Sequence, residues 1–265
     1  MPLLHAVVLG IVQGLSEFLP ISSSGHLVLV PWLFDWEELT RHPELNRTFD
    51  VALHVGTFVG AFAYFGRDVL QLATGNRRLG LVLLLSAVPA GLVGVFVDSL
   101  VEEQSEAIWL IGVMLIVFAL VLRWADRLPG TRQEGEFGVR EALLMGAAQA
   151  MALQPGVSRS GATISMGRWL GFGRSSAARL SFLMSLPVIG GAGLYEGFDV
   201  FVVGDGIPPG FAAPFLWGMV AAGLTGFVAV WGLLRLVRTR SFAPFVAYRI
   251  ALGTAVLALT PFVSH

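Results

Sequence analysis

Apolar runs long enough to cross a lipid bilayer recur along the whole chain and constrain its fold more than any other feature. A helix needs about 20 apolar residues to cross roughly 30 Å of hydrocarbon. Six runs approach that length, at residues 51–66, 79–97, 107–123, 180–196, 211–235 and 242–263. Because 55% of the residues are hydrophobic and only 13% are charged, no soluble domain is expected. We predict an all-α integral membrane protein with a single membrane domain, residues 1–265.

Two further segments, residues 3–31 and 140–166, combine apolar helices with a polar interruption. The first breaks at Pro20 and the second at Pro155, and each resumes as an apolar run after a polar cluster. Irregular polar backbone is tolerated at membrane depth only where protein buries it or where it lines a cavity. We therefore expect both interruptions to contribute to a site.

The loops between the predicted spans differ in charge. Most of the arginines lie in four connections, at residues 67–78, 123–140, 168–179 and 235–240. Basic loops favour the cytoplasmic side, whereas the acidic connections 98–106 and 196–210 contain no arginine and should lie outside. Threading the six spans between these loops makes both broken segments re-entrant helix–loop–helix hairpins, which enter the membrane from opposite faces.

The two broken segments also resemble each other in sequence. At an offset of 136 residues, Ala6–His26 aligns with Ala142–Ala162, and "AGLVG" at 90–94 later matches "AGLTG" at 222–226. Each half holds one hairpin and three spans, an odd number, so the halves must have opposite orientation. We therefore predict an inverted-topology repeat, with repeat 1 at about 1–126 and repeat 2 at about 137–265, and a site where the broken helices meet.

A carboxylate lies inside the first broken segment, in the stretch "GLSEFLPISSSGHLVLVPW". Glu17 comes immediately before the break, where the hairpin should be deepest. A charge at bilayer depth costs about 2.5–3.5 kcal/mol, so it needs a partner or a polar cavity. Gln13 lies four residues earlier on the same helix face. We place both side chains in the site; a carboxylate that reaches water at the outer end of the hairpin is the alternative.

Three consecutive serines, Ser22, Ser23 and Ser24, precede the next helical run. One serine is enough to cap a helix N-terminus, and three are a surplus. Free first-turn amides, a positive helix end and extra hydroxyl groups together form an anion site. This stretch therefore predicts that an anion binds at the first tip.

The second broken segment repeats these features in "PGVSRSG" and adds a cation. Ser158, Ser160 and Gly161 match residues of the first tip, and Arg159 is new. A guanidinium suits bidentate recognition of phosphate. If the two tips meet, two helix N-termini and Arg159 converge on one anion of high charge density.

A histidine completes the first polar cluster. His26 follows the serines within the first helical turn, where it can reach a neighbouring hydroxyl and act as a general base or acid. In the aligned halves, Glu17, Ser23 and His26 correspond to Leu153, Arg159 and Ala162. The first tip thus keeps reactive groups and the second keeps an anion clamp, which favours chemistry over symmetric transport. Asp50 and His54 could also line the cavity, with a helix-end role equally open.

At these residues the chain resembles the undecaprenyl-diphosphate phosphatase family, bacterial integral-membrane enzymes associated with bacitracin resistance. The resemblance rests on Gln13-x-x-x-Glu17 with "EFLPISSSGH" and on "PGVSRSG", and it covers essentially the whole chain. It implies hydrolysis of undecaprenyl diphosphate to undecaprenyl phosphate and inorganic phosphate at the outer face of the inner membrane, which recycles the lipid carrier for cell-wall synthesis. It also implies a divalent cation, Mg²⁺ or Ca²⁺. Gln13 occupies the first acidic position of the family motif and leaves Glu17 as the one carboxylate.

These residues and this resemblance define an expected mechanism. The substrate-binding groups would be Arg159 together with Gln13, Ser22, Ser24, Ser158, Ser160 and Gly161. The cation would bridge phosphate oxygens with Glu17 and Gln13. Ser23 is the preferred nucleophile and His26 assists proton transfer. Direct attack by a metal-activated water is the open alternative, and the polyprenyl chain would lie in a groove open to lipid.

Two rival functions share some of these features. A transporter or flippase for an anionic lipid or small anion would also use inverted repeats with broken helices. A phosphatidic-acid-type lipid phosphatase also uses a Ser-Gly-His element, but it needs a spaced histidine after a later Ser-Arg. Only the terminal His265 follows Ser158-Arg159 here.

Composition narrows the chemistry and the partners. The chain has no cysteine, which excludes disulfides, thiolate catalysis and Cys-based metal sites. A net charge of -1 gives no sign of nucleic-acid binding. The N-terminus predicts no cleaved signal peptide. The resemblance implies a multi-pass protein of the bacterial inner membrane whose active site opens to the periplasmic side. Its partners would be the lipid substrate and membrane lipids, and a homodimer remains an option.

Overall fold

The structure is a computed structural model that describes residues 1–36, 43–94, 107–198, 200, 206–207 and 210–262. Within these ranges the chain is helical, and the one β-type pairing is an isolated bridge between Arg132 and Phe172. The prediction of an all-α membrane protein is confirmed at this level. The predicted outer connection 98–106 and much of 196–210 lie outside the described residues.

Five of the described helices are long and apolar enough to cross a membrane. They correspond to five of the predicted spans and are α4 (Pro43–Thr74), α5 (Arg77–Leu85, with helix continuing at 87–94), α7 (Ile108–Arg127), α10 (Arg174–Phe198) and α11 (Ala212–Leu236). The sixth, α12 (Ala243–Leu259), has 17 residues and ends before the predicted limit at 263. At 1.5 Å per residue it is roughly 26 Å long, slightly short of the hydrocarbon thickness.

Each broken segment consists of two helices separated by a short turn. The first contains α1 (Leu3–Phe18) and α2 (Ser23–Phe34), and the second contains α8 (Val139–Ala150), η2 (Met151–Leu153) and α9 (Arg159–Trp169). Both breaks have the same cause. The residue before a proline is pushed out of the helical region by the proline ring. Leu19 before Pro20 has ψ 141° and Gln154 before Pro155 has ψ 121°, so each helix must end there.

The helix after each break begins with a serine cap. Ser22 has φ 79° and its hydroxyl accepts a hydrogen bond from the Gly25 amide at 3.4 Å. Ser158 has φ 73° and accepts from the Gly161 amide at 3.1 Å. A positive φ is unusual for a residue other than glycine and costs free energy. Equivalent serines in the same rare conformation give the two tips the same backbone shape.

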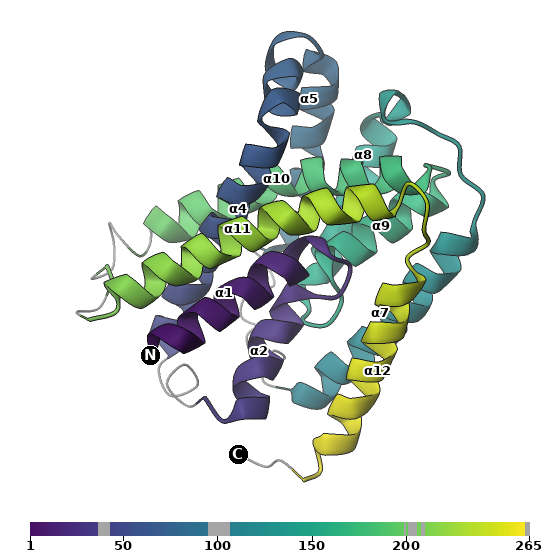
Figure 1. Cartoon of the computed structure of the whole chain (residues 1–265). Coiled ribbons are helices and arrows are strands. Elements are labelled where there is room, and N and C mark those ends of the chain that lie inside the picture. The colour runs from purple at the N-terminus through teal and green to yellow at the C-terminus, as the bar shows by residue number, and fades with distance from the viewer. Residues whose placement is uncertain (37–42, 95–106, 199, 201–205, 208–209, 263–265) are drawn as a thin grey trace.

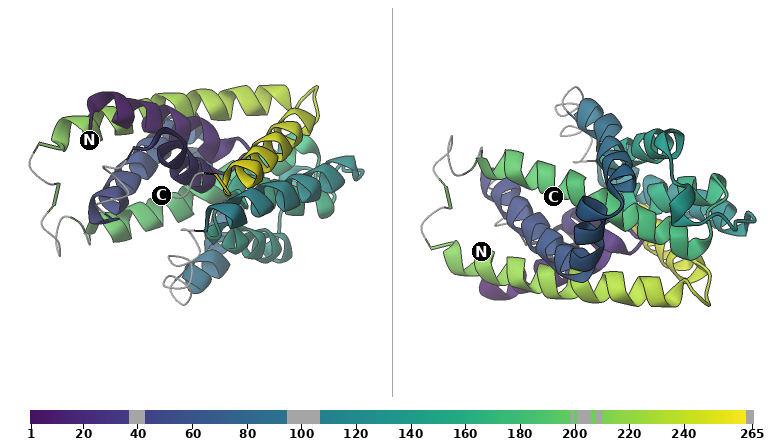
Figure 2. Two further views of the ribbon diagram at one scale, coloured as in Figure 1. Left: turned by 90° about the horizontal axis from the view of Figure 1, so that it is seen from below. Right: turned by 90° about the horizontal axis from the view of Figure 1, so that it is seen from above.

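Helices of one half of the chain pack against helices of the other. Figure 1 shows α11 alongside α1 and α4, and α12 alongside α7. Both views in Figure 2 keep α11 at one edge of the molecule and α10 on the other side of α4. In turn α5, from the first half, contacts α8 and α10 of the second. The two halves are therefore interlocked.

Glycines allow α11 to approach its neighbours closely. A Cβ added at Gly60 of α4 would lie 2.9 Å from the carbonyl carbon of Gly223, and one at Gly56 would meet Met219 equally closely. On α1, a Cβ at Gly14 would lie 2.7 Å from the Gly226 amide. Small residues at such positions let helix backbones make van der Waals contact in a membrane. This packing holds α1, and with it Glu17, in a fixed position.

Many large apolar side chains remain exposed on the outside of the helix assembly. Leu70, Leu81, Trp109, Leu224 and Trp231 are examples from four of the spans. In the spanning windows only 22–56% of the residues are buried. Because water would not favour such a surface, these faces are suited to contact with lipid.

We predict that Gly60→Ala destabilises the protein, whereas Gly66→Ala on the same helix does not. The added methyl at position 60 collides with backbone and should cost about 1–3 kcal/mol. A Cβ at Gly66 meets nothing within 4 Å, so better helix propensity should leave stability equal or raise it by up to about 1 kcal/mol. Thermal unfolding of both variants in detergent measures the difference. Equal melting temperatures would contradict this account of the α4–α11 contact.

Candidate active site

The tips of the two broken segments touch each other. The Gly156 amide donates to the Ser22 hydroxyl at 3.1 Å, and the Ser160 hydroxyl donates to the Leu19 carbonyl at 3.0 Å. The N-termini of α2 and α9 therefore lie side by side. Residues that are more than 130 positions apart in the sequence, each beside a proline break, form one polar centre.

Glu17 is at the middle of this centre. Its carboxylate is buried at the end of α1, and Oε2 accepts hydrogen bonds from the Ser23 hydroxyl at 2.6 Å and from the Gln13 amide at 3.0 Å. Oε1 accepts a hydrogen bond from Nη2 of Arg159, which forms an ion pair with it. A buried carboxylate needs such charge-assisted bonds to offset its lost hydration. The structure thus brings together four residues that the sequence predicted for the site.

His54 of α4 also approaches this carboxylate. Its Nε2 lies 3.8 Å from Glu17 Oε2, while Nδ1 contacts the Asp50 carbonyl at 2.8 Å. The His54 side chain is 35% exposed and that of Arg159 is 20% exposed, compared with 1% for Glu17. A ligand would therefore meet Arg159 and His54 first, and Glu17 lies beneath them at the buried end of the centre.

His26 points to a different partner. Its Nδ1 contacts the Ser22 carbonyl and its Nε2 contacts the Tyr248 hydroxyl, both at 2.6 Å. Because a carbonyl can only accept, Nδ1 carries the proton, and Nε2 of the neutral ring accepts from Tyr248. The ring also stacks on that tyrosine. His26 is thereby fixed at the start of α2, with the hydroxyl in reach being that of Tyr248 of α12.

The other predicted serines have distinct positions. Ser22 and Ser158 cap α2 and α9, and Ser160 bonds to both Ser158 at 3.2 Å and the first tip. These three hydroxyls hold the tips in shape. Ser24 is half-buried, and its side-chain hydroxyl makes no hydrogen bond with another described residue. Ser23 and Ser24 are therefore the hydroxyls best placed to meet a ligand.

Arg249 is a site residue that the sequence analysis missed. It is fully buried in α12, and its guanidinium donates to the carbonyls of Pro20 at 3.3 Å, Gly156 at 2.8 Å and Val157 at 3.0 Å, besides Leu115 of α7 at 3.2 Å. It therefore satisfies carbonyls that both breaks leave without helical partners. The available signal was an arginine in the middle of an apolar run, a costly position that marks a functional residue.

The oxygen atoms beside Glu17 suit a divalent cation. The buried Oε1 of Gln13 has no hydrogen-bond partner, although Nε2 of the same side chain is bonded to Glu17. Mg²⁺ is commonly held by one or two carboxylates together with substrate phosphates. Among the described residues, no group of three or more His, Cys, Asp or Glu could hold a metal. Glu17 and Gln13 would therefore need phosphate oxygens of a ligand to complete a coordination shell.

The arrangement combines an anion clamp with an activated hydroxyl. Two helix N-termini and the Arg159 guanidinium favour a phosphate-like anion. The Ser23 hydroxyl donates to a carboxylate that is able to accept its proton. Groups that position an anion beside a hydroxyl in this way are used in phosphoryl transfer.

Comparison with known proteins agrees with this chemistry. Residues 6–255 match the family described as "Bacitracin resistance protein BacA". A protein of Pelobacter propionicus named undecaprenyl-diphosphatase is 46% identical over 98% of this chain and 97% of its own length. Proteins with the same name from Geobacter sulfurreducens and Thermomicrobium roseum are 45% and 43% identical, each over 97% of this chain and 98% of their own. From its breaks, its paired tips and this similarity, the chain is a member of the BacA bacitracin-resistance family.

Proposed function

We propose that the chain hydrolyses undecaprenyl diphosphate to undecaprenyl phosphate and inorganic phosphate. The observation that carries the proposal is the pairing of one buried carboxylate, Glu17, with both the Ser23 hydroxyl and the Arg159 guanidinium. The relatives named undecaprenyl-diphosphatase support the choice of substrate, because they align over nearly the whole chain.

Substrate binding would begin at Arg159. Its guanidinium has five N–H donors and one of them is used on Glu17. The terminal phosphate replaces Glu17 as the acceptor for Arg159, and it also binds the first-turn amides of α2 and α9 and the Ser24 hydroxyl. The polyprenyl chain leaves the site along a lipid-facing groove between the helices. As Arg159 turns toward the phosphate, the Glu17 carboxylate becomes free to take a proton.

The chemical step is an attack by Ser23. Its Oγ bonds to the terminal phosphorus, and its proton passes to Glu17 over the existing 2.6 Å hydrogen bond. The bond from that phosphorus to the bridging oxygen breaks, and undecaprenyl phosphate departs. Water then attacks the phosphoserine, Ser23 regains the proton from Glu17, and inorganic phosphate is released. His26 supports the step by holding the first turn of α2, which carries Ser23, through its contact with the Ser22 carbonyl.

Direct attack by water on the terminal phosphorus gives the same products without a phosphoserine. A bound Mg²⁺ or Ca²⁺ would neutralise phosphate charge in either route. Glu17 and Gln13 would hold the cation together with phosphate oxygens. In the route without a phosphoserine, Glu17 takes a proton from water and Ser23 orients it.

We further propose that the two halves are inverted repeats and that the broken segments are re-entrant. In this arrangement the arginine-rich connections face the cytoplasm and the site opens to the outer face of the inner membrane. Undecaprenyl phosphate formed there can return to carry the next cell-wall unit. A transporter or flippase would use the same anion clamp. Membership of the BacA family and the Ser23–Glu17 hydrogen bond favour hydrolysis over passage of an unchanged substrate.

We predict that Glu17→Ala, Ser23→Ala and Arg159→Ala each lower phosphate release from undecaprenyl diphosphate by about 100-fold or more. Loss of one group that stabilises the transition state or transfers a proton typically costs this much. The purified full-length protein would be assayed with and without a chelator, and chelation should also abolish turnover. The matched controls are Ser185→Ala, whose hydroxyl bonds to its own helix, and the exposed Arg78→Gln. Full turnover by Glu17→Ala and Arg159→Ala would rule out this site.

We also predict that a radiolabelled terminal phosphate becomes trapped on the wild-type protein and not on Ser23→Ala. Rapid acid quenching during turnover, followed by peptide mapping, measures the adduct. An adduct that persists in Ser23→Ala would remove this serine as the nucleophile. Turnover with no adduct at any time would instead favour direct attack by water.

The proposed orientation predicts opposite labelling of two introduced cysteines. The natural chain has no cysteine; Gly135 is exposed and Gly197 is half-buried, and a Cβ at either position meets nothing within 4 Å. A thiol reagent that cannot cross the membrane should label Gly197→Cys in intact cells and should leave Gly135→Cys unlabelled until the cells are opened. Labelling of Gly135→Cys from outside would contradict the orientation.

A further inference from the structure

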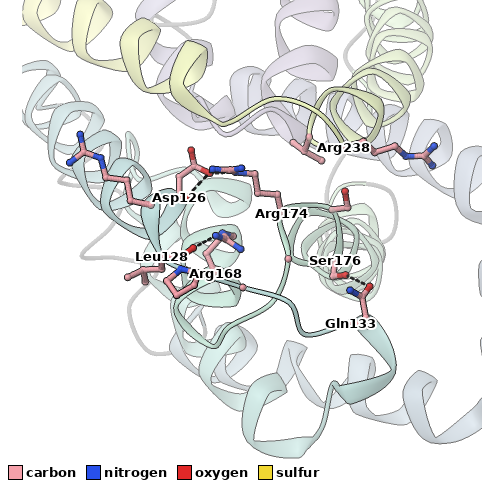
Figure 3. Close-up of a pocket in the computed structure, with 13 residues that line it drawn as sticks. Asp126, Leu128, Gln133, Arg168, Arg174, Ser176 and Arg238 are labelled. Atoms are coloured by element: carbon pink, nitrogen blue, oxygen red, sulfur yellow. Dashed lines mark hydrogen bonds and ion pairs between the residues drawn. The ribbon is translucent and has the colours of Figure 1, made fainter.

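A polar cavity lies at the ends of α7, α9 and α11 and at the start of α10. Its volume is about 610 Å³, and its lining comes from residues 126–130, 133, 168, 173–176 and 237–238. Figure 3 shows Asp126, Arg168, Arg174 and Arg238 drawn around it. Three of the four arginine-rich connections identified in the sequence therefore meet at one place. Nothing in the proposed reaction uses this cavity.

The lining is strongly positive. It contains four arginines and one aspartate, which give a formal charge of +3. The aspartate is already engaged, because Asp126 pairs with Nε of Arg174 at 2.5 Å and accepts from the Phe242 amide at 3.2 Å. Within the described residues, Arg127 and Arg238 form no ion pair. Asp126 is the one acidic side chain of the cavity lining, so most of the positive charge is not balanced there.

Arg168 is the most constrained of these cations. The residue is 4% exposed, and its guanidinium donates to the carbonyls of Phe172 at 2.5 Å and of Leu128. Its Nε is buried and has no hydrogen-bond partner. No carboxylate in the described part of the chain lies within ion-pair distance of it. A buried charge without a counter-ion is costly, so an anion in this cavity would be stabilising.

Backbone amides at the start of α10 add positive charge to the lining of this cavity. The 25-residue helix α10 begins at Arg174, and the cavity is lined by Arg174, Ser175 and Ser176 of its first turn. First-turn amides have no acceptor within their own helix and carry the positive end of the helix dipole. The Ser176 hydroxyl donates to Gln133 at 3.2 Å, so the side chain does not cap these amides. Guanidinium groups beside such amides recognise phosphate oxygens.

We propose that this cavity is a binding site for a phosphate group, supplied either by free inorganic phosphate or by the headgroup of an anionic phospholipid. The site is separate from the catalytic centre. Arg159 at the start of α9 and Arg168 near its end are nine residues apart, which is roughly 14 Å along the helix. The two anion sites thus lie at opposite ends of one short helix.

The test is thermal unfolding of the full-length protein with each source of phosphate. In nonionic detergent, inorganic phosphate should raise the wild-type melting temperature by about 3 °C or more relative to chloride at equal ionic strength. In nanodiscs, replacing part of the phosphatidylcholine with phosphatidylglycerol tests the lipid source in the same way. A shift with phosphate identifies the free anion, and a shift with phosphatidylglycerol alone identifies the headgroup. No shift in either arm overturns the proposal.

Four variants test whether the shift in melting temperature comes from this cavity. Arg168→Met removes the buried charge, and Ser175→Glu places a carboxylate among the first-turn amides, where it favours the helix; both should abolish the shift. The second variant keeps the test decisive if the first fails to fold. Arg78→Gln, which removes an exposed arginine elsewhere, should retain the shift. Because the catalytic clamp can also bind phosphate, the Arg168→Met and Ser175→Glu changes are made in an Arg159→Met background, which by itself should retain a shift. A shift that survives when Ser175→Glu is added to Arg159→Met, or that is absent in Arg159→Met alone, overturns the assignment.

Discussion

The structure depends on how backbone amide and carbonyl groups find hydrogen-bond partners at two helix breaks that are buried from water. A helix that ends inside an apolar environment leaves carbonyl and amide groups without partners, each at a cost of several kcal/mol. At each tip some of these groups bond to a serine of the other tip, and one further side chain bonds to carbonyls of both tips. The Ser22 hydroxyl accepts a hydrogen bond from the Gly156 amide, and the Ser160 hydroxyl donates one to the Leu19 carbonyl. Arg249 donates to carbonyls of both tips. Neither break could exist in this form without the other.

This arrangement also leaves several polar side chains that the backbone does not need as hydrogen-bond partners. The cap serines and Arg249 meet the needs of the backbone, so Ser23, Glu17 and Arg159 are not required for it. They form a polar cluster above the joined tips, with the carboxylate buried and the guanidinium partly exposed. Close packing of α1 against α11 then holds the carboxylate still. Rigid positioning of this kind lowers the reorganisation that a reaction would otherwise need.

The sequence predicted the elements and most of the centre, and it did so through local rules. Prolines at positions 20 and 155 marked both breaks, and the serine clusters marked the following helix starts. The repeat suggested that distant segments belong together, which is how Glu17 and Arg159 could be placed in one site in advance. Arg249 was missed because its partners are backbone carbonyls from three other segments, and no pattern in the sequence marks such partners. The contact of His26 with Tyr248, 222 residues away, was hidden for the same reason.

The interlocked halves have a consequence for how the protein is made. The carbonyls of the first tip are bonded by Arg249, which is 16 residues from the end of the 265-residue chain. The helix that packs most closely on α1 is α11, also in the last fifth of the sequence. During synthesis the first broken segment must therefore wait, without its final partners, until α11 and the segment that carries Arg249 have emerged from the ribosome. Assembly of the candidate active site is for this reason a late event in folding.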